Sequence, residues 1–309
     1  MAERYWKKLA LLAKLEDTYG TDATPTGVAN AMLGTDVSFT PLAGGEASRD
    51  LLLPYMGQQG VMLTGEYGQI EFSIEVAGSG TAGDAPAYGS LLRACGMAET
   101  VSEGEDVVYN PVSATFESVS LYYNRDGVRH ILLGCRGNFT VSLVPSQIPR
   151  FRFTMMGLLG TIADSALPTV DHTGFIKPVP VSKAKTTAAL HGFTGAFESL
   201  SFDMGQAVSP RMLINDEKIA LSDRAASGTA VVAADTLATK DWFSIIRERT
   251  RGALEAVHGT AAGNIVEFDA PSVEIGRPTE GQTDNVLNYS LPLMLCPSTG
   301  NDELTITVK

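Results

Sequence analysis

The chain has 309 residues, of which 44% are hydrophobic, so it is long enough for about two domains that each bury a core. Its 35 acidic and 23 basic residues give a formal net charge of −12, and such a surface repels a phosphate backbone, which argues against sequence-reading nucleic-acid binding. An acidic balance can also serve solubility alone. No stretch approaches the roughly 18 consecutive apolar residues of a membrane span, and the start MAERYWKKLA is unlike a signal peptide, so we expect a protein of a reducing cytoplasm or of a particle assembled there.

Alternation of apolar and polar residues dominates the chain and predicts a mainly β protein. In GQIEFSIEV one face of the expected strand carries four apolar residues: Ile70, Phe72, Ile74 and Val76. The other face carries four polar residues: Gln69, Glu71, Ser73 and Glu75. Two further runs flank Asn124, Arg125, Asp126 and Gly127, which predicts a hairpin because Asp and Gly accept the positive φ angles of its turn. More strands are expected at NFTVSLV, RFRFTMM, AFESLSFDM, NIVEF, NVLNYSLPLML and ELTITV.

Helices are few. The sequence predicts them at Ala87 to Cys95, Thr239 to Glu255 and Trp6 to Leu15. The first two contain a repeated phrase, since AYGSLLRACG aligns with DWFSIIRERT and places Arg93 opposite Arg247.

The order of elements is also repeated on both sides of this phrase. A Ser-Phe pair, Ser38-Phe39 in one half and Ser201-Phe202 in the other, comes before an alternating strand and then the helix. The simplest account is a duplication of one strand-rich unit with a single helix. We therefore expect two tandem domains, at residues 1–163 and 193–309, joined by a proline-containing linker at residues 164–192.

The segment GSGTAG, residues 78–83, matches the G-x-G-x-x-G pattern of dinucleotide-binding loops. That function requires a helix directly after the glycines and a parallel sheet, whereas here a helix cannot begin before Pro86 is passed and the neighbouring strands form hairpins. The corresponding place in the second half, AADTLATKD, has no glycine. A flexible loop between strand and helix is therefore the preferred interpretation.

No other pattern indicates an active site, a metal or a cofactor. His130, His172, His191 and His258 have no metal-ligand spacing, and Cys95, Cys135 and Cys296 form no C-x-x-C pair and are expected to be buried. Ser79 lacks the context of a catalytic serine, and the acids Glu103, Glu105 and Asp106 are typical of a solvated loop. We expect no enzyme and no cofactor.

Three segments of the first hundred residues carry a family resemblance: AKLEDTYGTDATPT, AGSGTAG and the pattern P-x-Y-G-x-L-L-R-A-C-G. With the intervening VSFTPLAGGEASRDLLLPYMG they resemble the major tail tube protein of long-tailed bacteriophages with non-contractile tails. The second half is similar mainly in its order of elements.

The resemblance implies two packed β-sheets with a flanking helix, hence two tandem β-sandwich or barrel domains of the tail-tube type. It also implies rings whose inner sheets join into one β-barrel and stack into a hollow tube, the conduit for genome ejection. Rings of this family usually hold six one-domain copies, so three two-domain chains would close a pseudo-sixfold ring. The implied partners are other copies of the chain, tail-tip, tail-terminator and tape-measure proteins, and passing genomic DNA without specific binding. No membrane is implied, and the location is the virion tail after assembly in the host cytoplasm.

Ring closure through strand edges fits a strand-rich unit, whose unpaired edges become the interface. The polar face of Gln69, Glu71, Ser73 and Glu75 is a candidate lumen wall, because acidic groups keep DNA from adhering, although an outer solvent face explains the same alternation. The turn residues Asn124, Arg125, Asp126 and Gly127, together with Trp6 and Leu9 of the N-terminal segment, are candidates for ring-to-ring contacts. An ordinary surface turn and an ordinary core helix are the alternatives.

Two other classes of protein are compatible with the sequence. A strand-rich acidic protein could be a carbohydrate-binding or adhesin β-sandwich of a virion or cell surface, although only two Trp and 7% aromatic residues give no evident sugar-binding cluster. An enzyme would require GSGTAG to hold phosphates.

Overall fold

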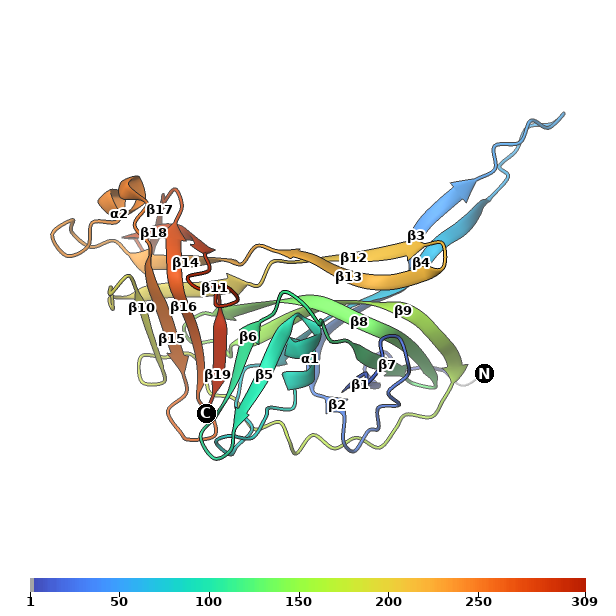
Figure 1. Ribbon diagram of the computed structural model, residues 1–309, viewed down its shortest axis with the longest axis horizontal. Coiled ribbons are helices and arrows are strands. Elements are labelled where there is room, and N and C mark those ends of the chain that lie inside the picture. The colour runs from blue at the N-terminus through green and yellow to red at the C-terminus, as the bar shows by residue number, and fades with distance from the viewer. Residues whose placement is uncertain (1–2) are drawn as a thin grey trace.

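A computed structural model describes residues 3–309, and over this range the chain is mainly β, with two short helices among nineteen strands (Figure 1). The predicted fold class is confirmed. Two sheets pack face to face as a β-sandwich, and hairpin arms project beyond it. Between residues 3 and 309 no helix is long and apolar enough to cross a membrane.

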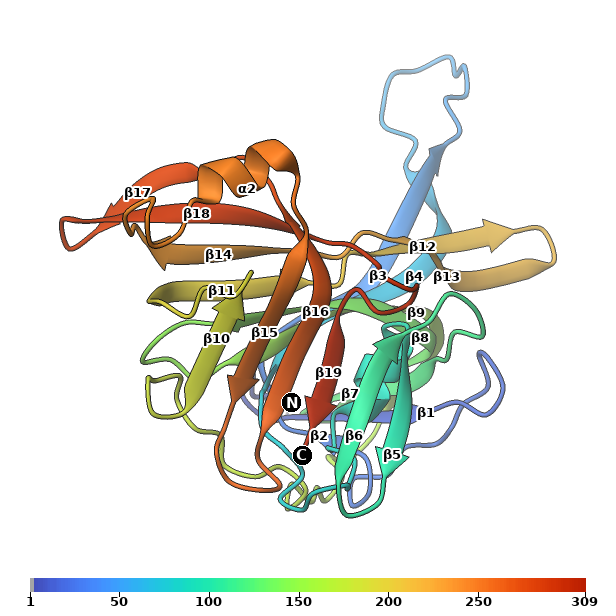
Figure 2. The same cartoon turned by 60° about the vertical axis from the view of Figure 1, so that its left-hand side comes forward.

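One sheet, here called the long sheet, contains eight antiparallel strands. Its spatial order is β3 (Gly34–Ser48), β4 (Val61–Glu75), β9 (Arg150–Asp164), β8 (Val128–Leu143), β11 (Phe197–Asp203), β14 (Ser227–Ala233), β18 (Val286–Leu295) and β17 (Thr279–Thr283). The second, here called the short sheet, runs in the order β10 (Thr186–Leu190), β15 (Gly252–His258), β16 (Val266–Ile275), β19 (Thr305–Val308), β6 (Asp106–Pro111) and β5 (Met97–Ser102), side by side in Figure 2. Both sheets therefore contain strands from both halves of the sequence.

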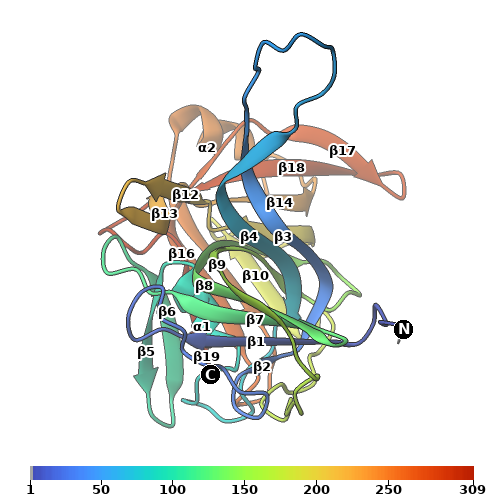
Figure 3. The same cartoon turned by 90° about the vertical axis from the view of Figure 1, so that its right-hand side faces the viewer.

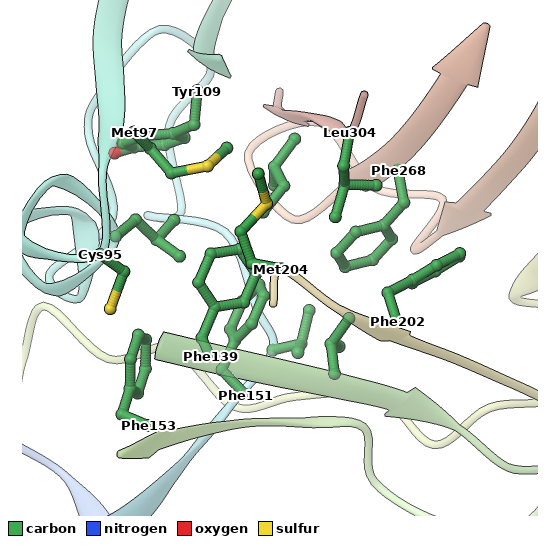
Figure 4. Close-up of a cluster of buried hydrophobic side chains, with 14 of the residues drawn as sticks. Cys95, Met97, Tyr109, Phe139, Phe151, Phe153, Phe202, Met204, Phe268 and Leu304 are labelled. Atoms are coloured by element: carbon green, nitrogen blue, oxygen red, sulfur yellow. The ribbon is translucent and has the colours of Figure 1, made fainter. Parts of the chain in front are cut away.

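The core lies between these sheets because one face of the long sheet is apolar throughout. Cross-strand partners share a face, and one row of partners across six strands is Ile74, Phe151, Val141, Phe202, Gly228 and Leu293. Phe268 of β16 reaches this row from the short sheet, with its ring centroid 6.0 Å from Phe151 and 5.7 Å from Phe202 (Figure 4). The residues of this cluster are buried in one continuous core that spans both halves.

A third group of strands extends the first half alone. It consists of β1 (Leu9–Leu15), which pairs with β2 (Ala31–Met32) and with β7 (Val119–Arg125), and β7 in turn pairs with β8. The hairpin predicted at residues 124–127 is present, since Arg125 pairs with Val128 and the turn residues Asp126 and Gly127 have φ angles of 33° and 97°.

The helix expected at Trp6 to Leu15 is wrong, because residues 9–15 form strand β1. Ala10, Leu11, Leu12 and Ala13 are all buried, so the strand is covered on both faces and shows no alternation. A continuous apolar run of this length does not distinguish a helix from a buried strand. Seven pairings with β7 decide the outcome.

The two helices of the repeated phrase are present but shorter than expected: α1 is Gly89–Ala94 and α2 is Trp242–Glu248. At the start of α2 the Asp241 carboxylate accepts a hydrogen bond from the Ser244 backbone N–H at 3.0 Å, an N-cap that satisfies a free helix donor. Arg249 ends α2 with a left-handed φ of 54°, and of the residues expected to continue the helix, Gly252 to Glu255 belong to β15.

Each half also carries a hairpin arm. β3 and β4 continue outward to a loop at residues 49–60, which projects from the molecule (Figure 3). In the second half β12 (Gln206–Leu213) and β13 (Asp216–Arg224) continue the β11–β14 pair almost in register, since Asp203 pairs with Ser227 and Gln206 with Arg224. Residues 164–181, from the expected linker, run along the first half, where Val181 N–H donates to the Gln147 carbonyl at 2.9 Å.

Candidate assembly interface

The two halves contribute four strands each to the long sheet, in the same order. The first half supplies β3-β4-β9-β8, and the second supplies β11-β14-β18-β17. In both, the helix follows the second strand of the set along the chain. The two halves therefore share one order of strands and helix.

The halves join at a seam between β8 and β11. Leu143 lies opposite Leu200 and Thr140 lies opposite Asp203, an antiparallel pairing of four residues on each strand. The side chain of Asn138 donates to the Asp203 carboxylate at 2.7 Å and reinforces the pairing. The seam is thus an ordinary β ladder between two repeats.

The outer strands of the long sheet have free edges. Within residues 3–309, β3 pairs only with β4 and β17 pairs only with β18. All five residues of β17 are exposed. Neither edge was recognised in the sequence, where TEGQT gives no strand alternation of apolar residues.

The polar face of the long sheet lies opposite the core and includes the four residues singled out on β4. Ser73 and Glu75 begin two rows of cross-strand partners across six strands. These rows are Ser73, Arg152, Thr140, Asp203, Ser227, Met294 and Glu75, Arg150, Ser142, Ser201, Thr229, Pro292. A shallow open hollow lies on this face over the seam, lined by residues of β8, β11 and β14.

Charges on this face are paired rather than uniformly acidic. Arg152 forms an ion pair with Glu71 at 2.6 Å, and Arg150 lies 3.5 Å from Asp36. Gln69 contacts Glu71 through its amide at 3.5 Å. Alternation along β4 predicted that Glu71 shares this face, but not that the register of β4 and β9 would bring Arg152 alongside it.

The two candidate segments for ring-to-ring contacts lie together. Arg4 donates to the backbone carbonyls of Arg125 and Asp126 at 2.7 and 2.9 Å, and the Arg125 guanidinium stacks 3.6 Å from the Trp6 ring centroid. Leu9 pairs with Arg125 across β1 and β7, whereas the Asn124 side chain is buried and donates to Ala10. Trp6 keeps 74% of its surface exposed.

His130 lies beside this segment, opposite Tyr123 on the adjacent strand. Its ring packs edge-on to Phe39 with centroids 5.1 Å apart. Burial lowers the pKa of His130, and the nearby Arg4 cation lowers it further. The histidine is therefore a neutral packing residue near pH 7.

The GSGTAG loop is packed against the other half. Gly78 N–H donates to the Asn264 side chain at 3.0 Å, and Gly80 N–H donates to the Gly263 carbonyl at 2.9 Å. A Cβ on Gly78 would come 2.0 Å from the Gly263 carbonyl oxygen. The glycines therefore permit close backbone contact between the halves, and the loop is occupied by protein rather than open to a phosphate. The expected loop between strand and helix is present, and its hydrogen-bond partner Asn264 lies 186 residues further along the sequence than Gly78.

No group of His, Cys, Asp and Glu side chains with metal-binding geometry occurs in the part of the chain that the structure describes. Burial raises the pKa of the Cys95 and Cys135 thiols, so neither is a reactive thiolate. Cys296 is partly exposed and unpaired.

A β-sandwich with an open polar face and free strand edges belongs to the class of structural proteins suited to edge-to-edge assembly. The family model described as phage tail tube protein matches residues 6–308, nearly the whole chain, and the chain therefore belongs to this family. No curated protein matches it significantly. It is accordingly a structural component of a phage tail, and family membership implies assembly into a tube and association with other tail proteins. This assignment favours a structural role over the adhesin and enzyme alternatives.

Proposed function

We propose that three chains close into a ring with pseudo-sixfold symmetry, and that these rings stack into the hollow tube of a non-contractile tail, through which the genome is ejected. The observation that supports this proposal is the seam between β8 and β11. It joins the two halves of one chain in the manner in which the free edges of neighbouring chains could join.

The strand order makes this argument specific. β17 occupies in the second half the place that β8 occupies in the first, and β3 occupies the place of β11. Pairing β17 of one chain with β3 of the next would therefore repeat the seam. Because every seam then has the same geometry, a ring of alternating halves closes without a special junction.

The polar face of the long sheet would line the lumen, because its other face is the core. Four acids lie on this face, Asp36, Glu71, Glu75 and Asp203, and two of them are paired with arginines. Ser and Thr fill most other positions of the two polar rows. A wall with neutral hydroxyls and no unpaired cation on β4 or β9 offers little attraction to phosphate, which suits DNA that must slide.

The exposed Trp6 and the turn at Asp126 and Gly127 are proposed to contact the next ring. Tape-measure protein inside the tube, with tip and terminator proteins at its ends, completes the proposed set of partners. Assembly would take place in the host cytoplasm before the tail joins the virion.

Negative-stain electron microscopy of concentrated protein tests this proposal through end-on views of the assemblies. We expect stacked rings of three chains and six similar lobes. A double substitution in β17, Gly281→Pro with Gln282→Pro, should prevent ring formation and leave the monomer folded, because β17 is exposed along its length and contributes little to the core. Rings of six chains, or a tube from the β17 variant, would disprove the proposed closure.

A further inference from the structure

The two hairpin arms are equivalent in the repeat but have different surroundings. The β12–β13 arm lies across the first half, where the Ile219 N–H donates to the Tyr19 hydroxyl at 2.6 Å and Arg136 donates to the Ile219 carbonyl at 3.0 Å. Ile219 is fully buried and Leu221 is 8% exposed. The part of this arm around Ile219 and Leu221 is thus covered by contacts within its own chain, and the arm lies alongside β8 and β9 in Figure 1.

The outer part of the β3–β4 arm has no such cover, although Met212 of β12 packs near Gly65 of β4. Ile70 and Gly228 correspond, because each pairs with the Phe of the Ser-Phe motif in its half. Leu63 and Leu221 each lie seven residues before these positions. In the first arm the corresponding residues Val61, Met62 and Leu63 are 49%, 59% and 53% exposed. Three consecutive exposed apolar residues on a projecting hairpin require an explanation.

The surface beneath the covered arm identifies where the bare arm would bind. Gln206 of the β12–β13 arm donates to the Cys95 carbonyl at the end of α1 at 2.9 Å, and the Leu221 side chain lies 3.3 Å from the Cβ position of Gly96. In the repeated phrase, Cys95 and Gly96 align with Arg249 and Thr250 at the end of α2. Both of these residues are exposed, so the equivalent surface in the second half is uncovered.

Charges on the two uncovered surfaces are complementary. The end of α2 carries Arg247 and Arg249, which are exposed and form no ion pair within residues 3–309. The β3–β4 arm carries the exposed carboxylates Glu46 and Glu66 on its two strands. In the first half, the β12–β13 arm occupies the same end of α1. Charge and the equivalence of the two halves therefore both indicate the β3–β4 arm as the segment that binds the end of α2.

We propose that the β3–β4 arm of one chain binds the second half of the neighbouring chain in the same ring, at the C-terminal end of α2, as the β12–β13 arm binds the first half of its own chain. This inference depends on the proposed ring. Val61, Met62 and Leu63 supply the apolar contact, while Glu46 and Glu66 face Arg247 and Arg249. The arm would thereby act as a clasp across each junction between chains.

Disulfide trapping tests the contact directly. Cys296 is first replaced by Ser because it is partly exposed and could itself be oxidised. Cys95 and Cys135 are buried and can remain. Chains with Leu63→Cys are then mixed with chains carrying Thr250→Cys, allowed to assemble and oxidised. We expect a covalent dimer that contains one chain of each kind, and no dimer from either variant alone. Tubes or rings without this dimer would overturn the arm contact and leave the ring intact, whereas failure of every sample, including the wild type, to form rings would overturn the ring and the contact together.

A chain that carries both Leu63→Cys and Thr250→Cys shows whether the arm binds a chain of its own ring or of another ring. If arms bind only within a ring, the covalent products stop at three chains. A longer ladder would show that the arm reaches another ring and would overturn the proposal.

Charge reversal provides a second test. Arg247→Glu with Arg249→Glu should raise the protein concentration required for assembly at least tenfold, and adding Glu46→Arg with Glu66→Arg should restore it. Lys183→Glu, an exposed change in the expected linker, is the control. Unchanged assembly of the first variant would contradict the inference.

Discussion

Leu143 of β8 lies opposite Leu200 of β11, and at this pair the two halves of the chain become one sheet. Both side chains are buried, so the seam is part of the core as well as a backbone ladder. A tail tube protein with this seam carries an interface between repeats inside a single chain.

Gly78→Ala should destabilise the contact between the halves, because the new Cβ would overlap the Gly263 carbonyl oxygen, at 2.0 Å. Overpacking of this kind lowers the free energy of unfolding by about 1–3 kcal/mol. Urea denaturation of the monomer measures the change. Gly174→Ala is the matched control, since its Cβ would only touch Ala87 at 3.6 Å and should alter stability by less than about 1 kcal/mol. Equal effects of the two changes would refute a steric role for Gly78.

Arg224→Ala should be severely destabilising. The Arg224 guanidinium binds Glu303 at 2.8 Å and the Val112 carbonyl at 2.8 Å, and the side chains of Arg224 and Glu303 are only 11% and 12% exposed. Removing the cation leaves the largely buried Glu303 carboxylate without its partner, at a cost of about 3–5 kcal/mol. Thermal and urea unfolding measure this loss of stability.

The control for this change is Arg251→Ala, which breaks an ion pair with Glu274 whose side chains are 51% and 24% exposed. Its cost should be below about 1 kcal/mol. A small effect of Arg224→Ala, comparable with this control, would argue that water reaches the buried pair.

The free energy of unfolding should decrease as pH falls, and His258 should cause part of this decrease. Burial lowers its pKa from the ordinary 6.5. Its Nε2 lies 3.1 Å from the Val179 carbonyl, and its Nδ1 lies 2.8 Å from the Thr186 hydroxyl, which suits a neutral ring that donates at Nε2 and accepts at Nδ1. Below about pH 6.5 the histidine binds a proton in the unfolded chain but not in the folded chain. The stability present above that pH is therefore lost as pH falls toward the pKa of the folded state. The loss is at most about 1.4 kcal/mol per pH unit.

Urea unfolding at about pH 7.5 and about pH 5 should therefore show a smaller loss for His258→Asn than for the wild type. His130 and His191, whose pKa values are also lowered by burial, are present in both proteins and cancel in the comparison. Identical pH dependence of the two proteins would exclude His258 as a contributor.

Glu71→Lys with Glu75→Lys should make assembled tubes retain DNA. Each change adds two units of positive charge to the polar face, and the loss of Glu71 also releases Arg152 from its ion pair. Attraction to phosphate therefore increases, and this attraction weakens as the salt concentration rises. Nuclease protection of short DNA in the tubes measures retention inside the lumen. Glu103→Lys with Glu105→Lys, in an exposed turn, makes the same charge change elsewhere. Protection of DNA by tubes of this control variant would count against a lumen at the polar face. Lack of DNA protection by tubes of the Glu71→Lys, Glu75→Lys variant would count against it as well.

Sequence patterns were sufficient where structure depends on local spacing. The alternation in GQIEFSIEV predicted which residues of β4 face the core, and the turn at Asp126 and Gly127 predicted the hairpin. The repeated phrase located both helices, and motifs in the first hundred residues indicated the family that the match over residues 6–308 establishes. In each case the signal comes from residues within a few positions of one another.

Tertiary structure decided the features that depend on distant partners. Residues 9–15 are a strand because β7 pairs with them, and an apolar run buried on both faces contains no periodicity that reveals this. GSGTAG contacts Asn264, and β8 meets β11, through pairings that no local pattern encodes. The sequence by itself determined the strands that alternate apolar and polar residues, and the kind of protein. The joining of the halves and the difference between the two arms arise from long-range packing, in which equivalent segments meet different neighbours.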